Sequence, residues 1–226
     1  MNIIKPKDAS SLIIYKTIKE KIYLLMGRRP AKQKFMPNIF VFPGGAVEKE
    51  DYKVSFYSDF TPMNLRALAY KSSLIRARAI GLASIRETYE ETGIFVGKTI
   101  NNSVKPQPST WRDFEINKIK PRLDILNYIA RAVTPVEQSK RFNARFFICD
   151  SKYTHGSITQ NNELLEIDWY PISEIVEKLP LAQVTHLIIK QCELYFQRPT
   201  KKGKGSIQIP IYSRRKGRRV TRYASY

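Results

Sequence analysis

The longest stretch of helical periodicity covers residues 65–92, and this stretch places the strongest constraint on the fold. Its apolar residues recur three and four positions apart, as they do along one face of a helix; they include Leu74, Ile75, Ile80, Leu82 and Ile85. Gly81 interrupts this pattern and predicts a kink or a division of the helix. Gly93 follows it and suits the left-handed position at which many helices end. A long helix, whole or divided, is therefore expected before Gly93.

Short segments of strand character lie on both sides of this helix. Residues 11–15 and 21–26 predict a hairpin, and residues 39–42 predict a strand that Pro43, Gly44 and Gly45 end. Further strands are expected at 125–133, 145–149 and 167–170, and helices at 111–119, at 173–178 with Ser173 as the N-cap, and at 181–196. This mixture predicts an α/β fold with a mixed β-sheet.

Length and composition fit one domain with a basic extension. The 226 residues are 42% hydrophobic, which is enough for a full core, and we expect a domain over 1–197 and a basic tail over 198–226. No apolar run approaches the roughly 20 residues of a membrane span, and the N-terminus lacks the apolar region of a signal peptide. Two cysteines cannot form a disulfide framework, and Cys149 is expected to be a buried strand thiol. These features predict a soluble, cytoplasmic protein.

The charge is strongly positive and uneven. Lys and Arg number 39 against 20 Asp and Glu, a net charge of +19, and residues 198–226 hold ten basic and no acidic residues. Such a charge favours phosphorylated metabolites, nucleic acid or an anionic membrane surface as partners. Tyrosines beside the basic run 214–219 suit an RNA or DNA clamp, but a solvated extension explains the run equally well. Alternation of Ile207, Ile209 and Ile211 with polar residues predicts a late strand that pairs with 219–223.

Three glutamates gather near the end of the predicted helix. Glu87, Glu90 and Glu91 are spaced i, i+3 and i+4, so they share one helical face, where like charges repel. Hard divalent cations take carboxylate oxygens as ligands and would convert this repulsion into coordination. Arg86 can fix one carboxylate by a bidentate contact. The alternative is an ordinary solvated acidic face.

The spacing around these glutamates resembles a known signature. Gly45, five residues, Asp51, and then Arg86-Glu87-x-x-Glu90-Glu91-x-Gly93-Ile94 is similar to the signature of the Nudix hydrolases. In that signature the first acid is Glu, and seven residues rather than the 34 found here separate it from the arginine. An insertion inside the signature, here at about 52–78, is a feature of the Nudix subgroup that resembles the peroxisomal coenzyme A diphosphatase. Segments 27–29, 35–37, 133–135 and 141–147 also resemble that subgroup, so the likeness covers about residues 10–195.

This resemblance implies an α/β/α sandwich that hydrolyses a diphosphate linkage with Mg²⁺ or Mn²⁺. It implies that Glu87, Glu90, Glu91 and the carbonyl of Gly44 bind the metal, and that Arg86 orients a carboxylate. A further acid after the signature often acts as ligand or base in this family. Glu163 and Glu166 are the first candidates, followed by Glu137; for each of them an ordinary surface position is an equal alternative.

Substrate recognition is less constrained. Arg28, Arg29, Arg141 and Arg145 lie in segments shared with the subgroup and can bind phosphates, or each can be solvated or form an ion pair. Coenzyme A or acyl-coenzyme A is the leading substrate, and a nucleotide sugar, a dinucleotide or an RNA 5′ end would suit the same charges. A different class of function is a nucleic-acid-binding Nudix-fold protein that uses the basic tail. The three glutamates favour catalysis, and the resemblance is compatible with a homodimer.

Overall fold

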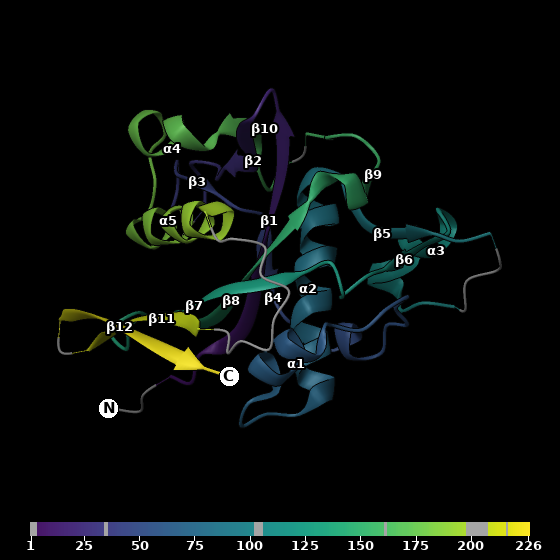
Figure 1. The fold of residues 1–226 in the computed structure, drawn as a ribbon, viewed down its shortest axis with the longest axis horizontal. Coiled ribbons are helices and arrows are strands. Elements are labelled where there is room, and N and C mark those ends of the chain that lie inside the picture. Colours follow the sequence, from purple (N-terminus) through teal and green to yellow (C-terminus); the bar gives the residue numbers. More distant parts are fainter. Residues whose placement is uncertain (1–3, 34–35, 102–105, 161, 198–207, 216) are drawn as a thin grey trace.

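A nine-stranded mixed sheet forms the centre of the molecule (Figure 1). The computed structural model describes residues 4–33, 36–101, 106–160, 162–197, 208–215 and 217–226. The strand order is β10-β2-β1-β8-β7-β11-β12, with β3 paired to β2 and β4 paired to β1. These strands are β1 (Lys7–Ile18), β2 (Lys21–Arg28), β3 (Phe40–Val41), β4 (Gly44–Ala46), β7 (Asn127–Val133), β8 (Phe142–Asp150), β10 (Leu165–Pro171), β11 (Gln208–Arg215) and β12 (Arg218–Ser225). Because β1 runs antiparallel to β2 and parallel to β8, the predicted mixed sheet is confirmed.

Helices cover both faces of this sheet, because its central strands are apolar on both sides. Leu12 and Ile14 of β1 face one hydrophobic cluster, and Ile13 between them faces the other. The first cluster includes residues of α1 (Pro62–Ala69) and α2 (Leu74–Thr92), and the second includes residues of α4 (Ile172–Lys178) and α5 (Gln183–Gln197). The molecule is therefore an α/β/α sandwich, as Figure 1 shows.

A small second sheet lies beyond the last turn of α2. Its order is β6-β5-β9, formed by β5 (Phe95–Thr99), β6 (Ile119–Pro121) and β9 (Thr154–His155). The helix predicted at 111–119 is shorter, α3 (Arg112–Ile116), and its predicted end at Ile119 is the first residue of β6. The prediction of Ser173 as an N-cap is wrong, since α4 begins at Ile172 and Pro171 occupies the cap position.

The long periodic segment forms two helices, and the division does not fall at Gly81. The chain breaks between α1 and α2, where the Ser73 hydroxyl caps α2 by accepting from the backbone N–H of Arg76 at 3.1 Å. Gly81 lies inside α2, where a Cβ would stand 2.4 Å from the ring of Phe60. Its role is close packing rather than bending. Gly93 ends α2 with a φ of +75°, as predicted.

The C-terminal residues that the structure describes belong to the sheet. Strands β11 and β12 form a hairpin, and β11 runs parallel to β7, with Ile211 beside Arg131. Ile209 and Tyr212 of β11 are buried in the two clusters. The predicted late strand and its partner are thus present, whereas Ile207 lies outside the described residues.

Two further expectations concern apolar side chains. Cys149 is a buried free thiol in β8, as predicted, and Cys192 is a buried free thiol in α5. Leu74 and Ile75, which the periodicity places on the apolar face, are exposed at the start of α2. Among the helices in the described part of the chain, none has both the length and the apolar character needed to cross a membrane.

Candidate active site

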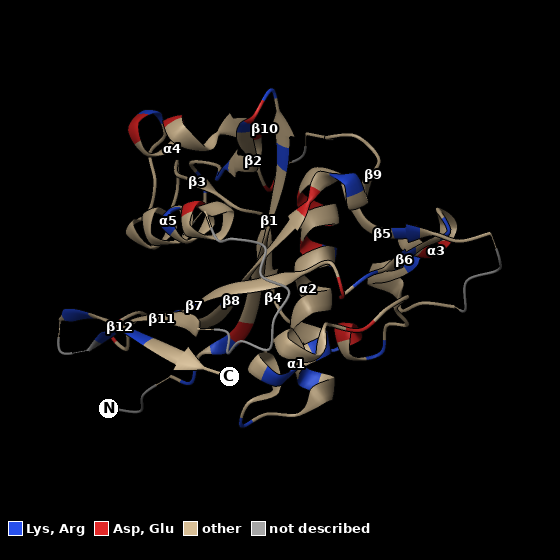
Figure 2. Ribbon diagram, viewed as in Figure 1, with Lys and Arg blue, Asp and Glu red and all other residues tan. Residues whose placement is uncertain are grey.

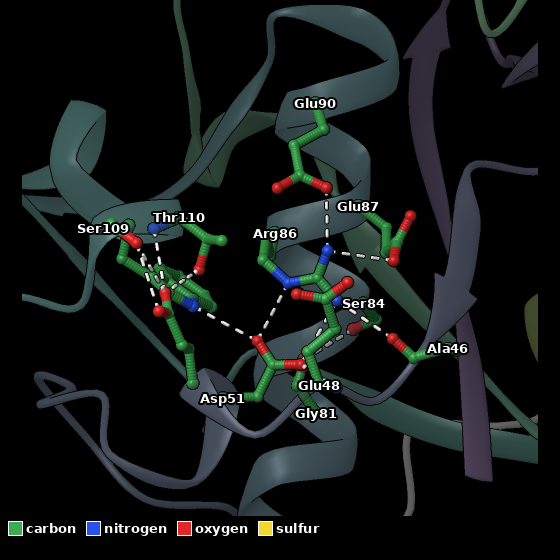
Figure 3. Close-up of polar contacts among 12 residues, drawn as sticks. Ala46, Glu48, Asp51, Gly81, Ser84, Arg86, Glu87, Glu90, Ser109 and Thr110 are labelled. Atoms are coloured by element: carbon green, nitrogen blue, oxygen red, sulfur yellow. Dashed lines mark hydrogen bonds and ion pairs between the residues drawn. The ribbon is translucent and has the colours of Figure 1, made fainter. Parts of the chain in front are cut away.

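The signature residues meet where the last turns of α2 pass strand β4. Figure 3 shows Arg86 at the centre of this group, between Asp51 on one side and the glutamates of its own helix on the other. The short strand β4 pairs with β1 through Ser11↔Gly44, which holds Gly44 and Gly45 beside α2. In Figure 2 the acidic residues of α2 lie near one end of the helix and basic residues lie near the other.

Arg86 is almost fully buried, with 2% of its surface exposed, and carboxylates surround it. Its Nε and Nη2 donate to the two oxygens of Asp51 at 2.9 and 3.2 Å, which is a bidentate contact. Its Nη1 lies 2.7 Å from Glu90 and 2.9 Å from Glu87. Burial lowers the pKa of the guanidinium, but the hydrogen bond with Asp51 and the surrounding negative charges raise that pKa by more. Arg86 is thus charged and held in one orientation.

Asp51 has no solvent exposure, and every oxygen has a partner. Besides Arg86, it accepts a hydrogen bond from the indole Nε1 of Trp111 at 3.1 Å and from the backbone N–H of Glu48 at 2.8 Å. The aspartate therefore reaches Arg86 despite being one methylene shorter than glutamate. The 34 residues that separate the two in sequence leave the site and return to it, forming α1 and the first turns of α2.

Glu87 lies directly against Gly45. A Cβ on Gly45 would stand 2.4 Å from both carboxylate oxygens of Glu87, so only glycine leaves room for this carboxylate. The pKa of Glu87 is raised to about 7, because burial and the charge of Glu90 raise it by more than the adjacent Arg86 lowers it. The carboxylate is thus held in a position where a bound cation would favour its charged form.

Glu91 and Glu90 occupy the same end of the helix in different environments. The Glu91 carboxylate accepts a hydrogen bond from the backbone N–H of Gly44 at 2.8 Å, and burial raises its pKa to about 8 against that bond. Glu90 is more exposed; burial also raises its pKa, whereas Arg86 lowers it. The charge of Glu87 contributes to the raised pKa of Glu91, as the shared helical face predicts, whereas the carboxylates that raise the pKa of Glu90 lie outside α2.

The chemistry of this donor set fits a divalent cation. Within the described ranges no three His, Cys, Asp or Glu side chains converge on one point in metal-ligand geometry, because Arg86 and the Gly44 amide hold these carboxylates. Oxygen donors are nevertheless the ligands that Mg²⁺ and Mn²⁺ prefer, and the pKa values of Glu87 and Glu91 stay raised even though Arg86 and Arg29 lower them, so a further positive charge would stabilise the two carboxylates. The absence of a side chain at Gly45 leaves space for the Glu87 carboxylate in its present position. A metal-ligand role for the Gly44 carbonyl stays a prediction.

The two candidate bases differ in position. The charge of Glu163 acts on Glu90 and Glu91, which places Glu163 beside the end of α2. Glu166 instead binds Arg28 through two hydrogen bonds of 2.6 and 2.9 Å, and this pairing lowers its pKa. Glu137 is exposed in the loop after β7. The geometry thus brings Glu163 to the site and gives Glu166 a different partner.

The four arginines considered for phosphate binding lie in different places. Arg29 is close enough to Glu91 for the two charges to interact, and Arg28 lies beside it at the end of β2. Arg141 donates to the backbone carbonyls of Thr134 and Ile4, which ties the start of β8 to neighbouring chain segments. Arg145 pairs with Asp8 at 2.7 Å. The structure therefore brings Arg29 to the glutamates but not Arg141 or Arg145.

Two contributors to the site were missed by the sequence analysis. The Ala46 carbonyl accepts from Nη2 of Arg86 at 2.9 Å, and the indole of Trp111 holds Asp51. A backbone carbonyl carries no sequence signal. A tryptophan 60 positions from its partner becomes informative only once the fold is known.

Searches for similar proteins agree with this geometry. No family model matches the chain. The chain is 26% identical over 205 residues to the acyl-coenzyme A diphosphatase NUDT19 of Xenopus laevis, a match covering 68% of this chain and 54% of that protein. It is 24% identical over 198 residues to the putative Nudix hydrolase 7 of Caenorhabditis elegans, covering 80% and 59%. The chain thus spans about half the length of the curated relatives that it matches.

Solved structures show the same fold. A Nudix hydrolase from Alicyclobacillus acidocaldarius superposes with a TM-score of 0.64 at 22% identity, covering 84% of this chain and 91% of that one. The Nudix domain of Shewanella oneidensis NrtR, solved with ADP-ribose, gives a TM-score of 0.50 at 10% identity, covering 86% and 90%. At these identities the likeness concerns the fold.

The assembled signature and the sandwich fold resemble those of the Nudix hydrolases. Among curated proteins, the chain is similar to the acyl-coenzyme A diphosphatase NUDT19 of Xenopus laevis.

Proposed function

We propose that the chain is a divalent-metal-dependent diphosphatase that hydrolyses a phosphoanhydride linkage in a nucleoside-diphosphate-type metabolite. The observation that supports this most strongly is the arrangement of Arg86 between Asp51 and the glutamates of α2, because it assembles the signature across a long insertion. Repulsion among three carboxylates on one helical face destabilises the fold, and a bound cation that takes part in hydrolysis would explain why it is present.

In this proposal Glu87 and Glu91 hold the cation, with Glu90 as a further ligand, and Arg86 keeps their helix face in position. Mg²⁺ or Mn²⁺ bound there would neutralise the diphosphate and increase the acidity of the attacking water. Arg86 is buried and its guanidinium is engaged by Asp51, the Ala46 carbonyl and the glutamates of α2, so we assign it as a positioning residue. The Gly44 N–H fixes one oxygen of Glu91 and leaves the other available to a cation.

Glu163 is the best-placed group to accept the proton of the attacking water. It interacts with Glu90 and Glu91, and it lies on the segment before β10, outside α2. Because Glu163 lies on a different segment, it could accept the proton of the water while the α2 carboxylates hold the cation. Arg29, near Glu91, is positioned to bind a substrate phosphate.

Coenzyme A or an acyl-coenzyme A is the leading substrate. The resemblance to the Xenopus laevis acyl-coenzyme A diphosphatase supports this choice, and so does the net charge of +19, because coenzyme A carries a diphosphate and a further phosphate. Hydrolysis would release 3′,5′-ADP and a phosphopantetheine.

Mass-spectrometric product analysis tests the proposal. The purified chain is incubated with Mg²⁺ or Mn²⁺ and coenzyme A, acyl-coenzyme A, ADP-ribose, NADH, diadenosine polyphosphates or 5′-triphosphate RNA. We expect turnover of the coenzyme A compounds that Glu91→Gln lowers at least ~100-fold. The control Glu174→Gln, which removes an exposed glutamate from α4, keeps the wild-type rate. Absence of metal-dependent turnover of every compound would contradict the proposal.

A further inference from the structure

A pocket lies at the opposite end of α2 from the glutamates. It has a volume of about 330 Å³ and lies among α1, the start of α2, strands β7 and β8 and the C-terminal hairpin. Its lining includes Tyr70, Lys71, Arg76, Arg131, Arg145 and Tyr226. Arg76 and Glu87 are eleven positions apart in α2, a rise of ~16 Å along the helix. The pocket is therefore separate from the candidate active site.

The floor of this pocket brings arginines together against their mutual repulsion. Arg131 of β7 and Arg145 of β8 are directly opposite in the antiparallel pairing, a position in which like charges destabilise a sheet. Arg145 is buried, with 6% of its side chain exposed. Burial lowers its pKa and the charge of Arg131 lowers that pKa further, whereas Asp8 raises it. Arg131 and Arg145 are therefore held side by side although their charges repel.

The carboxylate that compensates them is shared. Asp8 accepts from Nε and Nη2 of Arg76 at 2.6 and 2.8 Å and from Nη1 of Arg145 at 2.7 Å. Arg131 donates to the neutral amide oxygen of Asn143 at 2.7 Å, and within the described ranges it forms no ion pair. Lys71 adds a further positive charge at the rim. The pocket as a whole therefore has an excess of positive charge directed at one small volume, which favours an anionic ligand.

Aromatic rings complete the pocket. Tyr128 is buried within it, and the rings of Tyr70 and Tyr226 meet edge to face at its mouth with centroids 5.4 Å apart. Figure 1 shows the end of β12 beside α1, which is how these two tyrosines come together. Tyr70 belongs to the insertion and Tyr226 follows the C-terminal hairpin, so the two rings come from parts of the chain that the hydrolase signature leaves unexplained.

We propose that this pocket binds a mononucleotide, with its phosphate on the arginines and its base against the two tyrosines. Guanidinium groups match the geometry of phosphate oxygens, and tyrosine faces stack on nucleobases. The volume lies at the lower end of the ~300–1,000 Å³ range of small-molecule pockets, which suits one nucleotide rather than two. Inorganic phosphate shares the charge of this ligand but lacks the base.

Calorimetric titration of the full chain in EDTA tests the proposal, because EDTA removes metal-assisted binding at the glutamates. The probes are AMP, inorganic phosphate and adenosine. We expect AMP to bind more tightly than phosphate, and adenosine to bind at least ~10-fold more weakly than AMP because it lacks the charge. Arg131→Gln weakens AMP binding ~10-fold. The control Arg112→Gln removes an exposed arginine of α3 and leaves the affinity for AMP unchanged.

A second variant keeps the test valid if Arg131→Gln does not fold. Tyr226→Ala leaves the arginines in place, so it weakens binding of AMP but not of inorganic phosphate. Loss of metal-dependent hydrolysis is not expected in either pocket variant, which separates this site from the candidate active site. The proposal is overturned if neither AMP nor phosphate binds, if Arg131→Gln binds AMP as tightly as wild type, or if phosphate binds as tightly as AMP.

Discussion

Arg86 connects the structural and chemical roles of the signature. Its guanidinium holds Asp51 from another part of the chain, and the same group contacts Glu87 and Glu90 on its own helix. A buried cation with several carboxylate partners fixes their positions, whereas it adds little net stability compared with apolar packing. The main effect of Arg86 is therefore to hold these carboxylates in position.

Asp51→Asn tests this pairing at the residue scale. The substitution keeps the shape of the side chain but removes the charge opposite a guanidinium that is 2% exposed. We expect the free energy of unfolding to fall by about 3 kcal/mol, because a buried ion pair is broken on one side. Urea unfolding measures the change, and Glu174→Gln, which breaks an exposed pair with Lys178, should leave stability nearly unchanged. Equal effects of both variants would contradict this account of Asp51.

The sequence predicted the residues of α2 and Asp51 because their spacing is local or forms part of a known signature. It did not separate Glu163 from Glu166, which are only three positions apart in the sequence. In the structure Glu163 acts on the glutamates at the end of α2, whereas Glu166 pairs with Arg28. The arginines show the same limit. Arg29 and Arg145 carry the same charge, yet only the pairing of distant strands determines that one lies near Glu91 and the other near Asp8.

At the scale of elements, the packing of α2 depends on Gly81, which the sequence pattern predicted to kink or divide the helix. Sequence alone cannot distinguish a glycine that bends a helix from one that admits a neighbouring ring. The true division, before α2, carries a cap signal in Ser73 that the continuous apolar pattern obscured.

Gly81→Ala should therefore destabilise the protein. Alanine favours the helix by ~1 kcal/mol, but its methyl group would lie 2.4 Å from the Phe60 ring, and overpacking of this kind costs about 1–3 kcal/mol. A thermal melt should show a lower Tm. In a protein that already carries Phe60→Leu, Gly81→Ala should lower the Tm by less than it does in the wild-type protein. An increase in Tm for Gly81→Ala would show that the glycine has no packing role.

Asp8 links β1 to α2 and β8, and this link should depend on pH. Burial raises the pKa of Asp8, but Arg76 and Arg145 lower it by more, so its pKa in the folded state is below the unfolded value. Its contribution to stability is then fully present above ~pH 4 and is lost as pH falls through the lower folded pKa. Urea unfolding at several pH values should find Asp8→Asn less stable than wild type at pH 7, with the difference shrinking in acid. A difference that does not change with pH would contradict this assignment.

At the scale of the whole molecule, the C-terminal hairpin is part of the sheet and not only a charged extension. Its outer strand presents Arg218, Arg219 and Arg222 to solvent, whereas β11 contributes Ile209 and Tyr212 to the core. The sequence showed the charge clearly but gave only a weak alternation for the strand. Binding of nucleic acid by these arginines stays a prediction, as do a homodimer and a cytoplasmic location.

Deletion of residues 208–226 should lower the Tm and promote aggregation. It removes two buried side chains, each of which contributes about 1.5–3 kcal/mol, and it exposes the edge of β7. Replacing Arg218, Arg219 and Arg222 together with Gln should leave the Tm near the wild-type value, because those side chains are exposed. If the deletion melts like the wild type, the hairpin does not contribute to the folded domain.

The central claim is that the glutamates at the end of α2 bind the metal on which hydrolysis depends. Electron paramagnetic resonance of Mn²⁺ titrated into the protein measures this directly for wild type, Glu91→Gln and Glu174→Gln. We predict that wild type and Glu174→Gln bind Mn²⁺ with the same affinity and that Glu91→Gln binds at least ~10-fold more weakly. Equal Mn²⁺ affinity in all three proteins would contradict the assignment of this site.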